Sequence, residues 1–264
     1  GRYNDAINAV PSSFRRGVQR TYLSSPYFDS LATMNRSLEQ QMSGFRDIVA
    51  QNTIDAFTVS GIVDYMCMHP GSNAVRTLLS TGAAVSANSI TVSQAASILS
   101  AYDSLLAKNA EFASILHPAA QVCIDKITEA CSAENEKITI SENGAFVSVI
   151  QAAEVGDALV RYGRASGQVS LERGGYVILN SYLAESASFD LRTLASLYPI
   201  VVHDNPYYPH FALLGFDGGN AVWAWTCAAN MTYANDGRGT VTVTIDFPQS
   251  YTHYVIINGI QRFR

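Results

Sequence analysis

The sequence predicts an α+β protein, with an N-terminal all-α helical region followed by an antiparallel β-sandwich or jelly-roll-like region. Two patterns indicate this order. Apolar residues recur every three or four positions between about residues 12 and 134, as in amphipathic helices, and beyond about residue 136 they alternate with polar residues, as in half-buried strands. We therefore expect a helical domain over residues 1–135 and an antiparallel β-sandwich domain over residues 136–264.

Composition bounds the class of protein. Of the 264 residues, 48% are hydrophobic and only 15% are charged, and the formal net charge is −5. No apolar run approaches the roughly 20 residues needed to cross a bilayer, so we expect no transmembrane segment. The acidic balance disfavours nucleic acid as a partner, because nucleic-acid binding usually needs a dominant basic patch.

The cysteines indicate neither a metal site nor a disulfide framework. Cys67, Cys123, Cys131 and Cys227 include no CxxC pair, which weakens a zinc interpretation. On one continuous helix, Cys123 and Cys131 would lie about 12 Å apart, too far for a disulfide. We expect buried thiols, no cofactor, and no bond between Cys123 and Cys131.

Capping and breaking residues divide the helical region into segments. Ser12 or Ser13 caps a first helix, and Asp29 caps a second that reaches Val49. Thr91 and Gln94 form a capping box before a further apolar stripe, and Pro118 is expected to start the last helix. Two more helices are expected at residues 53–68 and 72–82. Short loops between these segments predict an antiparallel bundle or an orthogonal helical array.

Beyond residue 136 the sequence predicts eight or more strands. Asn143-Gly144 is expected to close a hairpin that pairs Ile140 with Val147 and Ile138 with Val149. Gly174-Gly175 is interpreted as a turn between two strands. Residues 188–197 are expected to form a short helix. The expected strands occupy residues 137–141, 145–152, 168–173, 176–182, 200–203, 211–216 and 251–258.

The clearest single element is a hairpin over residues 221–247. Its odd positions are large and apolar and its even positions small or polar, so one face should be buried. We expect Tyr233 opposite Val241 and Met231 opposite Val243, across a loop with an odd number of residues. Trp223 and Trp225 share the apolar face, which predicts core packing rather than a glycan-binding platform.

The densest polar and aromatic segment lies between two expected strands, at residues 203–210. His203, Asp204 and His210 could meet as metal ligands or as an acid–base set, which leaves a hydrolase as an alternative function, or they could simply lie on a loop between two strands. Tyr207 and Tyr208 stand on a loop stiffened by prolines, and such rings suit contact with a sugar or a protein. These five residues are the candidate ligand-binding residues, and no metal is expected there.

A second candidate surface is the arginine cluster near the N-terminus. Arg15, Arg16 and Arg20 lie largely off the apolar stripe of the first helix, where they could bind an anion or an acidic partner. A nucleoprotein or capsid-like assembly subunit using this cluster is the other alternative function.

The sequence contains no phosphate-binding loop, no zinc-protease motif and no serine-hydrolase elbow. We therefore expect a non-enzymatic structural or binding protein of an extracytoplasmic surface or assembly. The β-sandwich would be its recognition module, with a protein partner, a second copy of the chain or a carbohydrate as ligand.

Overall fold

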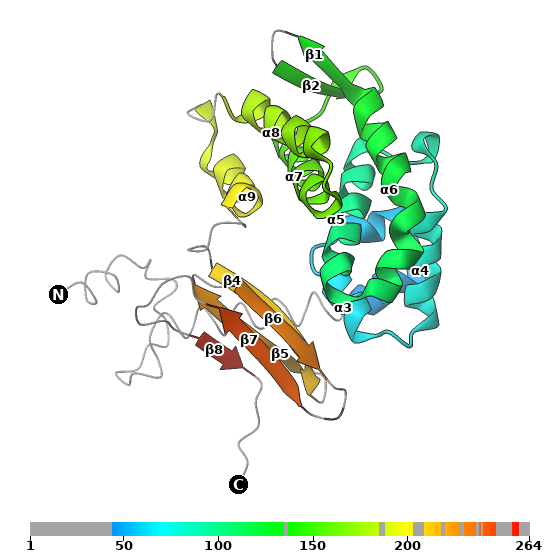
Figure 1. Ribbon diagram of the computed structural model, residues 1–264, viewed down its shortest axis with the longest axis vertical. Helices are drawn as coiled ribbons and strands as arrows, with labels where there is room; N and C mark the ends of the chain where they lie inside the picture. The colour runs from blue at the N-terminus through cyan, green and yellow to red at the C-terminus, as the bar shows by residue number, and fades with distance from the viewer. Residues whose placement is uncertain are drawn as a thin grey trace, which may run out of the picture.

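The structure is a computed structural model (Figure 1). It describes residues 44–134, 137–184, 188–202, 209–217, 220–227, 230–235, 238, 240–246 and 255–258. Most of these residues are helical, and the helices continue as far as Val202, well beyond the expected N-terminal region. The strands form only small antiparallel sheets of two or three strands.

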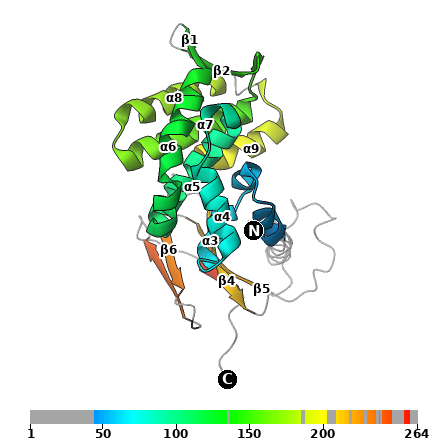
Figure 2. The same ribbon diagram turned by 90° about the vertical axis from the view of Figure 1, so that its right-hand side faces the viewer.

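The helical body begins with a helical stretch over residues 44–51. The elements after it are η2 (Ile54–Thr58), α3 (Ile62–Met68), α4 (Asn73–Ala83), η3 (Ala87–Ser89), α5 (Val92–Lys108), α6 (Ala110–Ala130), α7 (Val149–Ser166), α8 (Val169–Leu183) and α9 (Leu191–Val202). Helix α5 lies between α6 and α7 (Figure 1), and Figure 2 shows all three helices above the C-terminal strands. The side chains of Ile98, Leu99 and Leu105 on α5 are fully buried, as are Phe112 and Leu116 on α6.

Two local signals explain the boundaries of α5 and α6. The predicted capping box is confirmed, because the Gln94 amide donates to the Thr91 hydroxyl over 3.2 Å and the Thr91 amide donates to the Gln94 side chain over 2.8 Å. The prediction that Pro118 starts a helix is wrong. Helix α6 begins at Ala110, capped by Asn109, and continues through Pro118. Buried Leu116 and Ala119 flank this proline, so packing holds the helix together despite the lost hydrogen bond.

Helices α7 and α8 replace the expected strands at residues 168–173 and 176–182 and the second half of the one at residues 145–152. The two helices pack closely where Gly156 on α7 faces Gly175 on α8: an added Cβ at Gly175 would lie 2.5 Å from the Gly156 carbonyl oxygen. The Gly174-Gly175 turn is therefore a wrong interpretation. The missing side chain at Gly175 permits a helix–helix contact instead of a change in chain direction. The expected strand at residues 200–203 is also wrong as far as Val202, where α9 ends.

The Asn143-Gly144 hairpin is confirmed, but it is short. It joins β2 (Lys137–Glu142) to β3 (Ala145–Phe146), with Glu142 opposite Ala145 and both turn residues at positive φ. The expected pairing of Ile138 with Val149 does not form, because Ser148 and Gln151 make a second capping box that starts α7. Strand β1 (Cys131–Glu134), which the sequence did not predict, pairs with the other edge of β2.

The C-terminal strands form two further sheets, seen below the helices in Figure 1. Strand β5 (Asn220–Cys227) is the middle strand of one sheet, between β4 (Pro209–Asp217) and β8 (Val255–Asn258). The other is a ribbon of β6 (Asn230–Asn235) and β7 (Val241–Asp246). The expected strands at 211–216 and 251–258 correspond to β4 and, over its described part, to β8.

The long predicted hairpin is therefore only partly correct. Its first arm is divided between β5 and β6, which belong to different sheets. In the ribbon, Tyr233 pairs with Val243 rather than Val241, and Met231 with Ile245 rather than Val243. A shift of two residues keeps the same side chains on the same face, so the apolar residues are half-buried and Thr232, Thr242 and Thr244 are exposed, as the alternation predicts.

The predicted β-sandwich or jelly-roll region is contradicted. The apolar residues of β5 are buried against two different surfaces. Trp223 of β5 is 2% exposed and joins the core of the helical body, whereas neighbouring Ala224 packs with Leu214 and the apolar face of the ribbon. The hydrophobic core includes residues on both sides of position 135. The domain boundary there stays a prediction. None of the described helices is long and apolar enough to cross a membrane.

Candidate functional site

Most of the residues singled out in the sequence lie outside the part that the structure describes. This holds for Arg15, Arg16 and Arg20, and for His203, Asp204, Tyr207 and Tyr208. Only the backbone of His210 is described, in β4 opposite Thr226. The structure therefore does not test whether these side chains meet. Among the described residues, no group of three His, Cys, Asp or Glu side chains could hold a metal ion.

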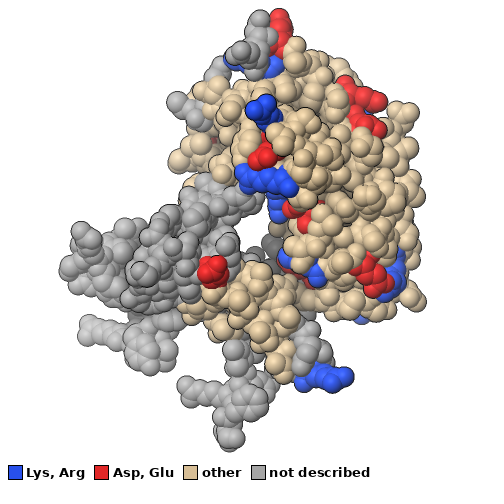
Figure 3. All heavy atoms as spheres, viewed as in Figure 1, with Lys and Arg blue, Asp and Glu red and all other residues tan. Residues whose placement is uncertain are grey.

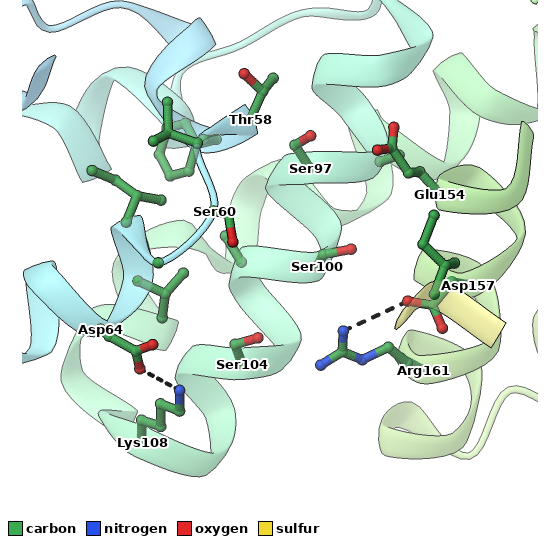
Figure 4. A pocket seen from close by; sticks show the side chains of 18 residues that line it. Thr58, Ser60, Asp64, Ser97, Ser100, Ser104, Lys108, Glu154, Asp157 and Arg161 are labelled. Atoms are coloured by element: carbon green, nitrogen blue, oxygen red, sulfur yellow. Dashed lines mark hydrogen bonds and ion pairs between the residues drawn. The ribbon is translucent and has the colours of Figure 1, made fainter. Parts of the chain in front are cut away.

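The described residues form a different candidate site, a polar groove of about 400 Å³ in the helical body (Figure 4). One wall is a face of α5, and the facing wall comes from α7. The turn between η2 and α3, around Ser60 and Gly61, lines a third side, and Ile200 of α9 contributes an apolar contact. This volume lies within the usual range of small-molecule sites, roughly 300–1,000 Å³.

The α5 wall carries a row of hydroxyl groups. Ser97, Ser100 and Ser104 are spaced by three and four residues, which places them on one face of the helix, and all three line the groove. The Ser97 hydroxyl donates to the Ser93 carbonyl oxygen over 2.9 Å. Within the described structure, the hydroxyls of Ser100 and Ser104 have no such partner. Their donor and acceptor positions are available to a ligand.

Two contacts fix the α7 wall against α5. The Gln151 side-chain amide donates to the Ser93 hydroxyl over 3.1 Å, and Arg161 Nε lies 3.2 Å from an Asp103 carboxylate oxygen. Both contacts join residues that are 58 positions apart, so α5 and α7 run parallel at a constant offset. Glu154 is therefore level with position 96, beside the start of the serine row.

Ion pairs occupy the end of the groove near Lys108. Lys108 Nζ lies 2.5 Å from Asp64 Oδ1, across the groove from α5 to α3. Arg161 bridges two carboxylates, Asp103 and Asp157, the second at 3.6 Å. The face in Figure 3 also shows cationic and anionic side chains interspersed along the helical body. The cations at this end of the groove, Lys108 and Arg161, are therefore already paired with carboxylates.

Glu154 differs from the other carboxylates that line the groove. Its side chain is exposed over part of its surface, yet the surrounding protein removes enough water to raise the pKa of the carboxyl group above its usual value. Within the described residues it has neither an ion pair nor a hydrogen bond. A carboxylate that is partly desolvated and unpaired marks a candidate binding position.

The described residues do not form a serine nucleophile with its base in this groove. A serine nucleophile needs a general base in hydrogen-bond contact with its hydroxyl. No described side chain makes that contact with Ser100 or Ser104. Both groove cations are already paired with carboxylates.

Sequence reasoning missed this groove because it followed the apolar residues. The serine row was visible in the sequence, at helical spacing and within a correctly expected helix. The matching row on α7, Glu154, Asp157 and Arg161, was hidden, because the start of this helix, at residues 149–152, was interpreted as part of a strand. Only the packing of α7 on α5 brings the two rows together.

Comparisons with protein-family models, with curated proteins and with solved structures find no match for this chain.

Proposed function

We propose that the protein is a non-enzymatic binding protein, and that the groove between α5 and α7 is its recognition site. The observation that carries the proposal is a set of polar groups in one cavity that have no hydrogen-bond or ion-pair partner among the described residues: the hydroxyls of Ser100 and Ser104 and the carboxylate of Glu154. A binding site of this size typically combines apolar walls with a few polar groups that orient the ligand. Ile62, Val63 and Ile200 supply apolar surface here.

The binding site would then lie in the helical body and not in the β region. An extracytoplasmic surface or assembly remains the proposed setting, and it is supported by composition alone. The hydrolase at residues 203–210 and the capsid-like subunit using Arg15, Arg16 and Arg20 also stay predictions, because the structure does not describe those side chains.

The test is a protein-observed NMR screen with a library of small polar compounds. We expect binders that shift the amide signals of α5 and α7 together. A Ser100→Leu variant places a bulky apolar side chain in the groove and should abolish those shifts. Ser114→Leu is the matched control, because Ser114 is exposed on α6 and does not line the groove.

Thermal unfolding of both variants checks that each is folded. Two results would contradict the proposal. One is a set of binders whose shifts are unchanged by Ser100→Leu. The other is turnover of a substrate that the Ser100→Leu variant no longer supports, which would make the groove an active site.

A further inference from the structure

We infer that the groove takes a small hydroxylated amine, with its ammonium group on Glu154 and its hydroxyl groups along the serines of α5. This inference rests on the proposed function and adds the chemical class of the ligand. It is argued from the charge balance of the groove, from the position of Glu154 and from the residue types that line the cavity.

Among the described residues, the charge balance of the groove leaves one carboxylate without a counter-ion. The charged residues that line the groove are Asp64, Glu154, Asp157, Lys108 and Arg161. Lys108 pairs with Asp64, and Arg161 pairs with Asp157 and also with Asp103 behind it. Glu154 is the remaining anion, and a ligand cation would complete the set.

Partial desolvation makes the charged form of the unpaired Glu154 carboxylate less stable than it would be in water. The protein around Glu154 disfavours the charged carboxylate, which is why the pKa of this group is raised. An ammonium group in hydrogen-bond contact would reverse the effect, because an opposite charge within about 4–6 Å favours the ionised form. Charge-assisted hydrogen bonds are also stronger than neutral ones. Glu154 is thus poised for a cationic partner rather than an anionic one.

The serine row supplies complementary contacts for hydroxyl groups. The constant offset between α5 and α7 sets Glu154 level with position 96, so its carboxylate lies near Ser97 and Ser100 (Figure 4). A serine hydroxyl can both donate and accept, which matches a ligand hydroxyl that does the same. A ligand that holds an ammonium and hydroxyls on adjacent carbons could therefore contact both walls.

The same walls disfavour a flat aromatic ligand. Phe57 is the one aromatic side chain that lines the groove, and it is only 5% exposed, so the described residues offer no open ring on which a ligand could stack. Recognition must come from polar contacts, from shape and from the aliphatic side chains of the groove rather than from stacking. This favours compact, saturated and highly polar molecules such as amino sugars and amino alcohols.

Matched probes test the inference. Glucosamine carries an amine at the position of one glucose hydroxyl, and ethanolamine differs from ethylene glycol in the same way. NMR titrations at near-neutral pH and low salt should give groove shifts with glucosamine or ethanolamine. We expect the neutral partner to bind at least about tenfold more weakly, in line with the loss of one charge-assisted hydrogen bond.

Variants separate the two parts of the site. Glu154→Gln keeps the size of the side chain and should weaken the amine at least about tenfold without affecting the neutral probe. Ser100→Ala with Ser104→Ala should weaken both probes alike. Glu129→Gln is the control, since it removes the same charge at an exposed site on α6 that does not line the groove.

The outcomes distinguish this inference from the proposed function. Equal binding of the amine and its neutral partner, or no effect of Glu154→Gln, would overturn the ammonium assignment and leave the groove as a binding site. The absence of groove shifts with both amines, while other polar compounds shift it, would do the same. If no compound of any class shifts the groove, both the inference and the proposed function fail.

Discussion

The phenol hydroxyl of Tyr233 donates a hydrogen bond to Asp64 Oδ1 over 3.5 Å, and so joins two residues that lie 169 positions apart. The same carboxylate oxygen accepts from Lys108 at the end of the groove. Strand β6 is thereby connected to the wall of the candidate site. The β6–β7 ribbon and the groove share one carboxylate, although neither the hairpin pattern nor the helix pattern indicates that they meet.

Replacing Tyr233 with Phe should loosen this connection at a small cost. The bond is long, so we expect Tyr233→Phe to lower the free energy of unfolding by about 0.5–1 kcal/mol, measured by urea unfolding. Hydrogen exchange should speed up in β6 and β7 more than in α5. Unchanged exchange in the ribbon would contradict a structural role for this contact.

Tyr233 should also affect stability at alkaline pH. Burial raises the pKa of its hydroxyl, with Asp64 and Cys67 adding to the effect. The unfolded chain then releases this proton near pH 10 while the folded chain retains it, so the stabilising contribution is complete below pH 10 and is lost as the pH rises further. Tyr233→Phe should reduce that loss, whereas Tyr198→Phe, at an exposed tyrosine, should not.

The two adjacent glycines of α8 should respond in opposite ways to alanine. An added Cβ at Gly175 would lie 2.5 Å from the Gly156 carbonyl oxygen and 2.7 Å from Val160, so Gly175→Ala should destabilise the protein by about 1–3 kcal/mol. At Gly174 an added Cβ meets nothing within 4 Å, and Gly174→Ala should stabilise the helix by about 0.5–1 kcal/mol. Equal effects in thermal unfolding would contradict the packing of α7 on α8.

Trp223 should be among the most costly side chains to remove. It is 2% exposed and belongs to the core of the helical body, so Trp223→Ala should cost about 3–5 kcal/mol of an expected total of roughly 5–15 kcal/mol. Phe146→Ala is the control, because Phe146 is 77% exposed. The finding that both variants unfold at the temperature of the parent would refute the docking of β5 on the helices. The structure does not describe the side chain of Trp225, so its expected core position stays a prediction.

Glu154→Gln should stabilise the free protein at neutral pH. Because the pKa of Glu154 is raised in the folded state, its contribution to stability is complete below the unfolded value of about 4.5 and is lost as the pH rises through the folded value. We expect the variant to unfold up to about 2 °C higher than the parent at pH 7, a small gain because the side chain is partly hydrated. The difference should disappear near pH 4. A lower unfolding temperature at pH 7 would mean that Glu154 has a stabilising partner in the free protein.

The thiol of Cys123, which alone among the described cysteines is fully buried, should be unreactive in the folded protein. Cys67, Cys123 and Cys131 are free, which agrees with the expectation that Cys123 and Cys131 are not bonded to each other. Burial raises the pKa of Cys67 to about 11 and that of Cys123 to about 12, so little thiolate is present at pH 8. Alkylation followed by peptide mapping should modify Cys123 only after denaturant is added. Rapid modification of Cys123 in native buffer would contradict its burial.

Local sequence signals determined the elements whose cause is itself local. The Thr91–Gln94 capping box starts α5, the Asn143-Gly144 pair turns β2 into β3, and the alternation after Met231 assigns each side of the ribbon to core or solvent. Each of these depends on hydrogen bonds or side-chain periods within a few residues. The sequence carries them whatever the rest of the chain does.

Only the tertiary structure decided the features that depend on contacts between distant segments. Gly175 is compatible with a turn or with close helix packing, and the approach of Gly156 selects the helix. Apolar and polar residues alternate through β5 and β6 as if they were one strand, yet the two strands belong to different sheets. Trp223 packs into the core of the helical body, and Tyr233 contacts Asp64. The groove exists because α7 packs parallel to α5 and brings Glu154 beside a serine row 50 or more residues earlier in the chain. Such contacts are set by the shape and burial of surfaces that meet only in the folded protein, and a one-dimensional pattern does not contain them.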